Sequence, residues 1–119
     1  MALADLQRAG LIDDGRFARE LARAKSGRLD GNRTVRSALA KAGVAPGVAE
    51  EVVSELGDDQ ERALTLAEHR ARRLTGLDPQ TAFRRLYGHL LRRGYGPDVA
   101  RDACRRALTG LLQDDPTGP

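Results

Sequence analysis

The chain has 119 residues, of which 40% are hydrophobic, 31% are charged and only 3% are aromatic, with no Trp. This composition predicts one small globular domain whose core is built from Leu, Ala and Val. The single cysteine, Cys104, excludes an internal disulfide and a zinc cluster held by cysteines. No apolar run reaches the ~20 residues of a membrane helix, and the polar start does not resemble a signal peptide. We therefore expect a cytoplasmic protein with no membrane partner.

Apolar residues recur with the period of an α-helix throughout the sequence, whereas no stretch alternates apolar and polar residues as a strand does. The sequence therefore predicts an all-α fold. Asp13 or Asp14 is expected to cap a helix that follows a short first helix, because a carboxylate accepts hydrogen bonds from the free N–H groups of the first turn. Phe17 and Leu21 are expected on the buried face of that helix.

The later helices are delimited by Asp and Pro at their starts and by Gly at their ends, where glycine takes the left-handed conformation. The expected starts and stops are Asp30 and Gly43 for the third helix, Pro46 and Gly57 for the fourth, Asp58 or Asp59 for the fifth, Asp78-Pro79 and Gly94 for the sixth, and Pro97 for the seventh.

An internal repeat organises these helices. Shifting the chain by 51 residues pairs Leu39 with Leu90, Lys41 with Arg92, Gly43 with Gly94, Pro46 with Pro97, Val48 with Val99 and Ala49 with Ala100. The pairs fall on one helix, its glycine stop and the proline start of the next helix. They predict tandem three-helix repeats that stack on one another. The expected divisions are a remnant helix of a preceding repeat over 1–10, repeats over 11–57 and 58–109, and a flexible tail over 110–119.

Positive charge is concentrated in the second repeat. From Arg70 to Arg106 the sequence has ten Arg and three Asp, a net +7 over 37 residues. Because guanidinium groups bind oxyanions through paired hydrogen bonds, this excess favours contact with phosphates or with an acidic protein. The candidate contacts lie on the sixth and seventh helices: Arg85, Arg92, Arg93, Arg101, Arg105 and Arg106.

The closing helices of the two repeats differ in charge. Glu50, Ser54 and Glu55 of the first repeat align with Arg101, Arg105 and Arg106 of the second. We expect packing not to require this exchange, so it favours a polyanionic partner for the second repeat alone. The alternative interpretation is that these arginines are only the solvated face of amphipathic helices and that the many arginines reflect the base composition of the gene.

Two motifs resemble the RecX family of bacterial recombination regulators. Leu11-Ile12-Asp13-Asp14 with Arg16-Phe17-Ala18 resembles the junction of its first and second repeats. Leu77-Asp78-Pro79, Leu86-Tyr87 and the run from Leu90 to Tyr95 resemble its last repeat. The resemblance implies tandem three-helix repeats, usually three in number, that bind the RecA recombinase filament on DNA and inhibit its ATP hydrolysis and strand exchange. The structural motif positions are Asp13, Asp14, Phe17, Tyr87 and Gly94 from these motifs, with Gly43, Pro46 and Pro97 from the internal repeat.

The residues themselves favour a regulator that is not an enzyme. His69 and His89 lie on separate helices, and no nucleophile, base and orienting group stand at motif spacing. No glycine-rich phosphate loop, metal-ligand set or cofactor motif is present, so we expect no cofactor and no small-molecule substrate. The alternative is a stand-alone helical nucleic-acid-binding module for single- or double-stranded DNA. Among the aromatic residues, only Tyr95 is expected to be exposed.

Overall fold

The structure is a computed structural model that describes residues 14–113. It contains six α-helices and one short 3₁₀ helix: α2 (Asp14–Gly27), α3 (Asn32–Lys41), α4 (Pro46–Leu56), α5 (Gln60–Ala71), η1 (Arg72–Leu74), α6 (Pro79–Arg92) and α7 (Pro97–Gln113). No strand occurs within these residues, which confirms the all-α prediction. The helix expected within 1–10 and the capping residue Asp13 lie outside the described residues.

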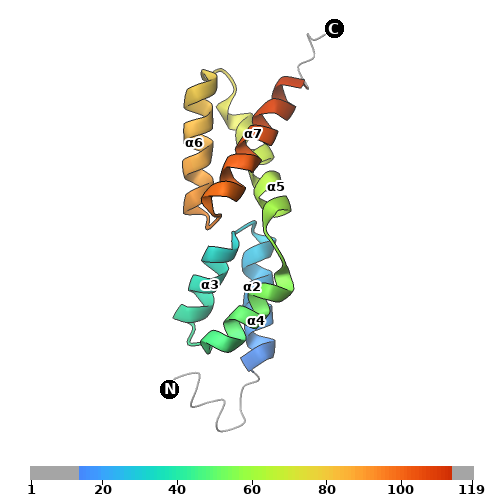
Figure 1. Ribbon diagram of the computed structural model, residues 1–119, viewed down its shortest axis with the longest axis vertical. Helices are drawn as coiled ribbons and strands as arrows, with labels where there is room; N and C mark the ends of the chain where they lie inside the picture. The colour runs from blue at the N-terminus through green and yellow to red at the C-terminus, as the bar shows by residue number, and fades with distance from the viewer. Residues whose placement is uncertain (1–13, 114–119) are drawn as a thin grey trace.

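The helices form two three-helix units stacked end to end (Figure 1). The first unit contains α2, α3 and α4, and the second contains α5, α6 and α7. The result is an elongated molecule with extents of 65 × 22 × 20 Å. The two units have separate hydrophobic cores, as expected for stacked repeats in which each unit contacts its neighbour only at its end.

The core of the first unit depends on small residues of α2. Ala18 and Ala22 are buried against Val35 and Leu39 of α3, and their small side chains allow the helices to approach closely. The prediction that Phe17 and Leu21 share the buried face was wrong for Phe17, which is 36% exposed. Phe17 precedes the buried alanine by one position, so the helical period places it about 100° away from the core.

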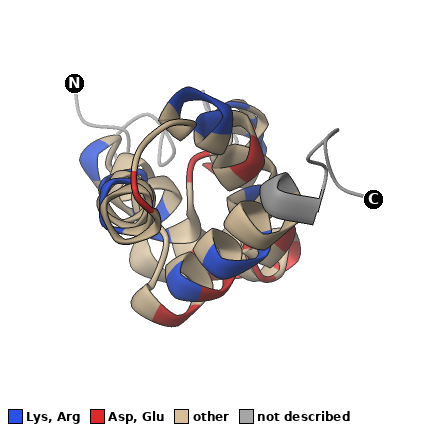
Figure 2. Cartoon of the chain, turned by 90° about the horizontal axis from the view of Figure 1, so that it is seen from above, with Lys and Arg blue, Asp and Glu red and all other residues tan. Residues whose placement is uncertain are grey.

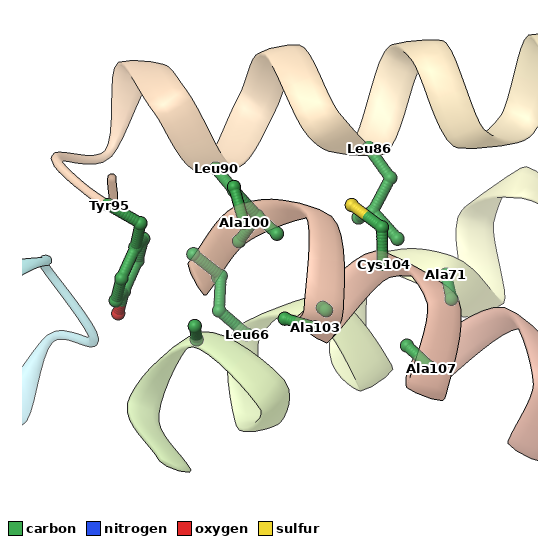
Figure 3. Close-up of a cluster of buried hydrophobic side chains, with 11 residues drawn as sticks. Leu66, Ala71, Leu86, Leu90, Tyr95, Ala100, Ala103, Cys104 and Ala107 are labelled. Carbon is green, nitrogen blue, oxygen red and sulfur yellow. The ribbon is translucent and has the colours of Figure 1, made fainter. Parts of the chain in front are cut away.

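The core of the second unit contains an aromatic residue that was predicted to be exposed. Tyr95 was expected to be exposed because it follows a helix stop, but it is 1% exposed and is the largest fully buried side chain. Figure 3 shows its ring directed from the α6–α7 turn towards the loop between α2 and α3. Its hydroxyl donates a hydrogen bond to the Leu29 carbonyl. Cys104 is fully buried in the same cluster, as expected for a small core residue.

Most predicted helix ends are confirmed. Gly43 and Gly94 have φ angles of 85° and 97°, the left-handed region that side chains disfavour. Pro46 and Pro97 are the first residues of α4 and α7. The carboxylate of Asp78 accepts hydrogen bonds from the Thr81 N–H at 2.9 Å and from the Thr81 hydroxyl at 2.7 Å, so it caps α6 as predicted.

One helix start and one stop differ from the expectation. Asp30 does not cap α3, whose N-cap is Gly31 without a side-chain hydrogen bond. For α5, where Asp58 or Asp59 was expected, Oδ1 of Asp58 accepts a hydrogen bond of 3.2 Å from the Gln60 N–H, whereas Asp59, at the N-cap position, makes no side-chain cap to its own helix. α7 continues past Gly110 to Gln113, because glycine lowers helix stability without preventing the helix. Asp14 is the first residue of α2.

The two displaced aspartates act across the junction between the units. Oδ2 of Asp59 accepts a hydrogen bond of 2.8 Å from the N–H of Asn32, the first residue of α3. Asp30 forms an ion pair with Arg93, with 2.9 Å between Oδ1 and Nε. Arg62 of α5 donates hydrogen bonds to the Asp30 carbonyl and to Oδ1 of Asn32. Each side chain therefore connects the unit that carries it to the other unit.

The C-terminus of α6 is joined to the N-terminus of α3 by backbone hydrogen bonds. The Gly31 N–H donates to the Arg93 carbonyl at 2.8 Å, and the Arg33 N–H donates to the Gly94 carbonyl at 3.1 Å. A helix end with free N–H groups thus meets a helix end with free carbonyls, which satisfies both ends and aligns their dipoles. The approach requires glycine, since a Cβ on Gly31 would lie 2.3 Å from the Gly94 oxygen.

Candidate functional site

The six candidate arginines do not form one surface. Viewed along the long axis, the Lys and Arg positions occur on several sides of the molecule (Figure 2). The structure divides the candidates into three groups: Arg85 and Arg92 on α6, Arg93 at the junction, and Arg101, Arg105 and Arg106 on α7.

Arg85 and Arg92 lie beside a basic hollow between α5, η1 and α6. The hollow has a volume of about 380 Å³. Its charged or titratable lining residues are Arg70, Arg84, Arg85, His89 and Arg92, and the term basic hollow denotes these five residues below. Gly88 and Leu74 complete its wall. Within residues 14–113, none of the four arginines forms an ion pair. The hollow therefore gathers positive charge from arginines that form no ion pair within that range, although the charge of Arg84 helps to lower the pKa of Asp78.

The charge of the basic hollow affects His89. Burial lowers the pKa of His89 below its ordinary value of 6.5, and the positive charges of Arg70, Arg93, Arg92 and Arg73 lower it further. His89 is therefore neutral at pH 7. An anion in the hollow would offset the surrounding positive charge and raise this pKa. The hollow can thus accept an oxyanion from several guanidinium groups, with a neutral imidazole beside it.

Arg93 serves the junction instead of an open surface. Its side chain is 31% exposed and its partner Asp30 is 12% exposed. The guanidinium also donates a hydrogen bond to the Arg28 carbonyl. Because Nε and one terminal nitrogen of its guanidinium donate within the molecule, Arg93 connects the two units.

The three arginines of α7 are exposed, but two of them form ion pairs within their own helix. Arg101 lies 3.5 Å from Asp98, and Arg106 lies 3.8 Å from Asp102. Such exposed pairs contribute little to stability and exchange readily for other partners. Arg105 is exposed and makes no ion pair within the described residues.

The charge exchange between the closing helices has a packing consequence that was not expected. Glu50 forms an ion pair of 2.9 Å with Arg36. The positions 51 residues later hold Arg101 and Tyr87, and there the Arg101 guanidinium lies 6.0 Å from the centre of the Tyr87 ring. An ion pair in the first unit thus corresponds to a cation–π contact in the second. Tyr87 also stacks with Phe83, with 6.0 Å between ring centroids.

Glu55 is likewise paired within the first unit. Its carboxylate accepts hydrogen bonds from Nε and Nη2 of Arg19 at 2.9 and 3.1 Å. The bond from Arg19 is also the largest cause that lowers the pKa of Glu55. Glu50 and Glu55 therefore have ion-pair partners within their own unit, so the charge exchange alone does not identify a partner surface.

Two arginines of the basic hollow, and His89, were not among the candidate contacts. Arg70 lies on α5 and Arg84 on α6. Both belong to the basic stretch of the sequence, but only the antiparallel packing of α5 and α6 brings Arg70 beside Arg85 and Arg92. No group of three His, Cys, Asp or Glu residues between Asp14 and Gln113 could hold a metal ion. None of the helices described in that range is long and apolar enough to cross a membrane.

A family model and individual relatives all point to the same protein family. The family model of the third three-helix domain of RecX matches residues 58–104, which is most of the second unit. The chain is 38% identical to the regulatory protein RecX of Trichlorobacter lovleyi over 109 residues, which cover 84% of this chain and 68% of that protein. The chain belongs to the RecX family.

Other RecX relatives agree with this assignment. The regulatory protein RecX of Streptomyces coelicolor is 34% identical over 89% of this chain and 58% of its own length. The RecX of Clostridium botulinum strain Eklund 17B is 29% identical over 92% of this chain and 53% of its own length. This RecX-family chain thus spans between about half and two thirds of these relatives. No solved structure matches it.

Proposed function

We propose that this RecX-family chain is a non-enzymatic regulator that binds the RecA recombinase filament and its DNA and inhibits its ATP hydrolysis and strand exchange. The observation that carries the proposal is the basic hollow on the unit that matches the third RecX domain. A filament on DNA presents phosphates and acidic side chains, and both are oxyanions that arginine binds well.

The proposed mechanism is steric and electrostatic. The basic hollow contacts an oxyanion of the filament through Arg70, Arg85 and Arg92. The elongated stack of two units then occupies space along the filament. Rotation of RecA subunits or entry of a second DNA strand is hindered, so ATP turnover and strand exchange slow without any reaction on this chain. The exposed arginines of α7 supply a second, weaker contact.

The test is ATP hydrolysis by RecA of the same organism on single-stranded DNA, with this chain titrated at fixed salt. The parent chain is expected to inhibit at substoichiometric amounts. The double variant Arg85→Glu/Arg92→Glu should lose most of this inhibition, because an acidic hollow repels the oxyanion. The matched control Arg23→Glu/Lys41→Glu changes the same charge at exposed positions of the first unit and should inhibit like the parent. Equal inhibition by the parent and both double variants would contradict the role of the hollow.

The stand-alone nucleic-acid module remains the second candidate. It predicts that the chain binds DNA without RecA, with an affinity that falls steeply as salt rises, since each neutralised phosphate releases counterions. If the chain is such a module, the triple variant Arg101→Glu/Arg105→Glu/Arg106→Glu should bind DNA with a lower affinity than the parent. No inhibition of RecA by the parent, combined with intact DNA binding, would favour this module over the filament regulator.

A further inference from the structure

The basic hollow contains a histidine among its arginines. His89 lines the hollow together with Arg85 and Arg92 of the same helix and Arg70 of α5. The imidazole is half-buried, so it remains accessible from the hollow. Histidine is the side chain whose ordinary pKa lies nearest to neutral pH. The hollow therefore holds one group whose charge can change when the surroundings change.

The charges that act on His89 are positive. Burial is the largest cause that lowers the pKa of His89 below its ordinary value of 6.5, and the charges of Arg70, Arg93, Arg92 and Arg73 follow. These arginines belong to α5, η1 and α6, whereas α7 contributes no residue to the hollow. Within residues 14–113, no acidic side chain of the hollow balances a proton on His89. A bound anion would supply this negative charge and favour the protonated imidazole.

The arginines of the hollow extend over more than the length of one carboxylate. Arg85 and Arg92 are seven residues apart on α6, a rise of about 10 Å along the helix axis. Along a duplex, each strand carries one phosphate charge about every 3.4 Å, so several phosphates of a strand cover this length. A single acidic side chain presents one carboxylate and contacts only part of it. The extent of the hollow therefore favours a nucleic-acid strand over an isolated acidic side chain.

Glycine leaves space in the wall of the hollow. Gly88 lies one turn before Arg92, and a Cβ at position 88 would lie 3.2 Å from Nη1 of Arg92. Glycine inside a helix lowers its stability relative to alanine, so helix formation does not account for this residue. The missing side chain gives room to the Arg92 guanidinium beside the hollow, where Arg92 is exposed to a ligand.

We propose that the basic hollow binds successive phosphates of a DNA strand and that His89 takes up one proton from solvent when they bind. This inference rests on the proposed function, because it names the oxyanion that the hollow contacts. Arg70, Arg85 and Arg92 donate hydrogen bonds to phosphate oxygens, and the imidazolium donates a further N–H. The affinity is therefore highest below the pKa of His89 in the free chain and falls as the pH rises through its pKa in the complex.

The test measures the affinity of this chain for oligothymidylate without RecA, between about pH 5.5 and pH 8 at constant ionic strength. Fluorescence anisotropy of a pH-insensitive rhodamine label reports binding. Phosphodiesters and thymine do not titrate in this range, unlike a phosphate monoester, whose second pKa is about 6. The affinity of the parent should fall by up to about tenfold, the change that corresponds to a rise of one unit in the pKa of His89 on binding.

Two variants locate the proton, because His69 and His89 are the two histidines of the sequence. His89→Gln should lose the pH dependence and bind at every pH about as the parent does at pH 8, where the imidazole is neutral. His69→Gln changes an exposed residue of α5 outside the hollow and should keep the pH profile of the parent. A parent affinity that does not depend on pH, or the same pH dependence in His89→Gln, would overturn the proposal.

Proton NMR of the imidazole resonances follows the proton in the unaltered chain. The pKa of His89 should lie below 6.5 in the free chain and should rise when oligothymidylate is added, with the His69 resonance as internal control. This measurement needs no variant, so it decides the question even if His89→Gln does not fold. A pKa of His89 that is the same in the free chain and in the complex would contradict proton uptake.

An oligoglutamate of the same charge tests the class of ligand. It should displace the labelled DNA less well than unlabelled oligothymidylate does, and equal displacement would identify an acidic protein as the ligand and rule out the proposal. ATP hydrolysis by RecA is measured separately with the same chain. A lack of inhibition there contradicts the proposed regulator, whereas the pH dependence of oligothymidylate binding tests the hollow and His89 alone.

Discussion

At the scale of single residues, two buried groups hold their protons more tightly than usual. Burial raises the pKa of Tyr95 from 10.0 to about 12 and that of Cys104 from 9.0 to about 12. In both cases the protonated form is favoured by folding. The stability that these groups contribute is therefore present below the unfolded-state pKa and is lost as the pH rises towards 12.

The substitution Tyr95→Phe removes the hydroxyl and keeps the ring, so it measures the contribution of the hydroxyl alone. The variant should lose about 1 kcal/mol of unfolding free energy at pH 7, because the hydrogen bond to the Leu29 carbonyl disappears. It should also lose less stability than the parent between pH 10 and pH 11. Urea denaturation at the three pH values measures both effects. Tyr87→Phe is the control, and a pH profile of Tyr95→Phe equal to that of the parent would contradict the assignment.

At the scale of helices, α3 and α6 meet end to end through backbone hydrogen bonds, and this contact is called the joint here. Gly31→Ala places a Cβ against the Gly94 carbonyl, so the joint must open, and we expect a loss of about 2–3 kcal/mol. Gly31 lacks a positive φ angle, so this loss is steric. Gly47→Ala in α4 has nothing within 4 Å and should gain roughly 0.5–1 kcal/mol. Urea denaturation measures the free energy of unfolding of both variants. If Gly31→Ala unfolds with the same free energy as the parent, the close contact at this joint does not exist.

Helix ends were predictable from the sequence because their causes are local. Gly43, Gly94, Pro46 and Pro97 each act through their own φ angle or missing N–H. The roles of Asp30 and Asp59 were not predictable in this way, because their partners lie far along the chain. An aspartate before a helix has the same local pattern whether it caps that helix or another one.

The candidate site was predicted only in part for the same reason. The excess of arginine in the second unit follows from counting, but the division of these residues depends on the packing of α5, α6 and α7. Arg92 and Arg93 are adjacent in sequence, yet one lines the basic hollow and the other pairs with Asp30. Tyr95 was misplaced because its burial depends on the neighbouring unit.

At the scale of the whole molecule, the ion pair of Arg93 and Asp30 couples the two units. Arg93→Ala should leave each core intact but cost about 1–3 kcal/mol, since a mostly buried carboxylate loses its partner. We expect the single unfolding transition to broaden or divide into two, as measured by circular dichroism in urea. Asp30→Asn in the same chain should recover part of the loss, and Arg92→Ala should not broaden the transition. Full additivity of the two changes would argue against the pair.

The joint between the units includes two hydrogen bonds made by backbone groups alone, and this has a consequence for how such chains diverge. Carbonyls and N–H groups are present whatever the side chains are, so the outer faces of the two units can change independently while the spacing of the stack is kept. The exchange of the Arg36–Glu50 ion pair for the Tyr87–Arg101 contact is one such change. A duplicated unit can therefore acquire its own partner without altering the attachment of its neighbour, and one array can divide several tasks among its members.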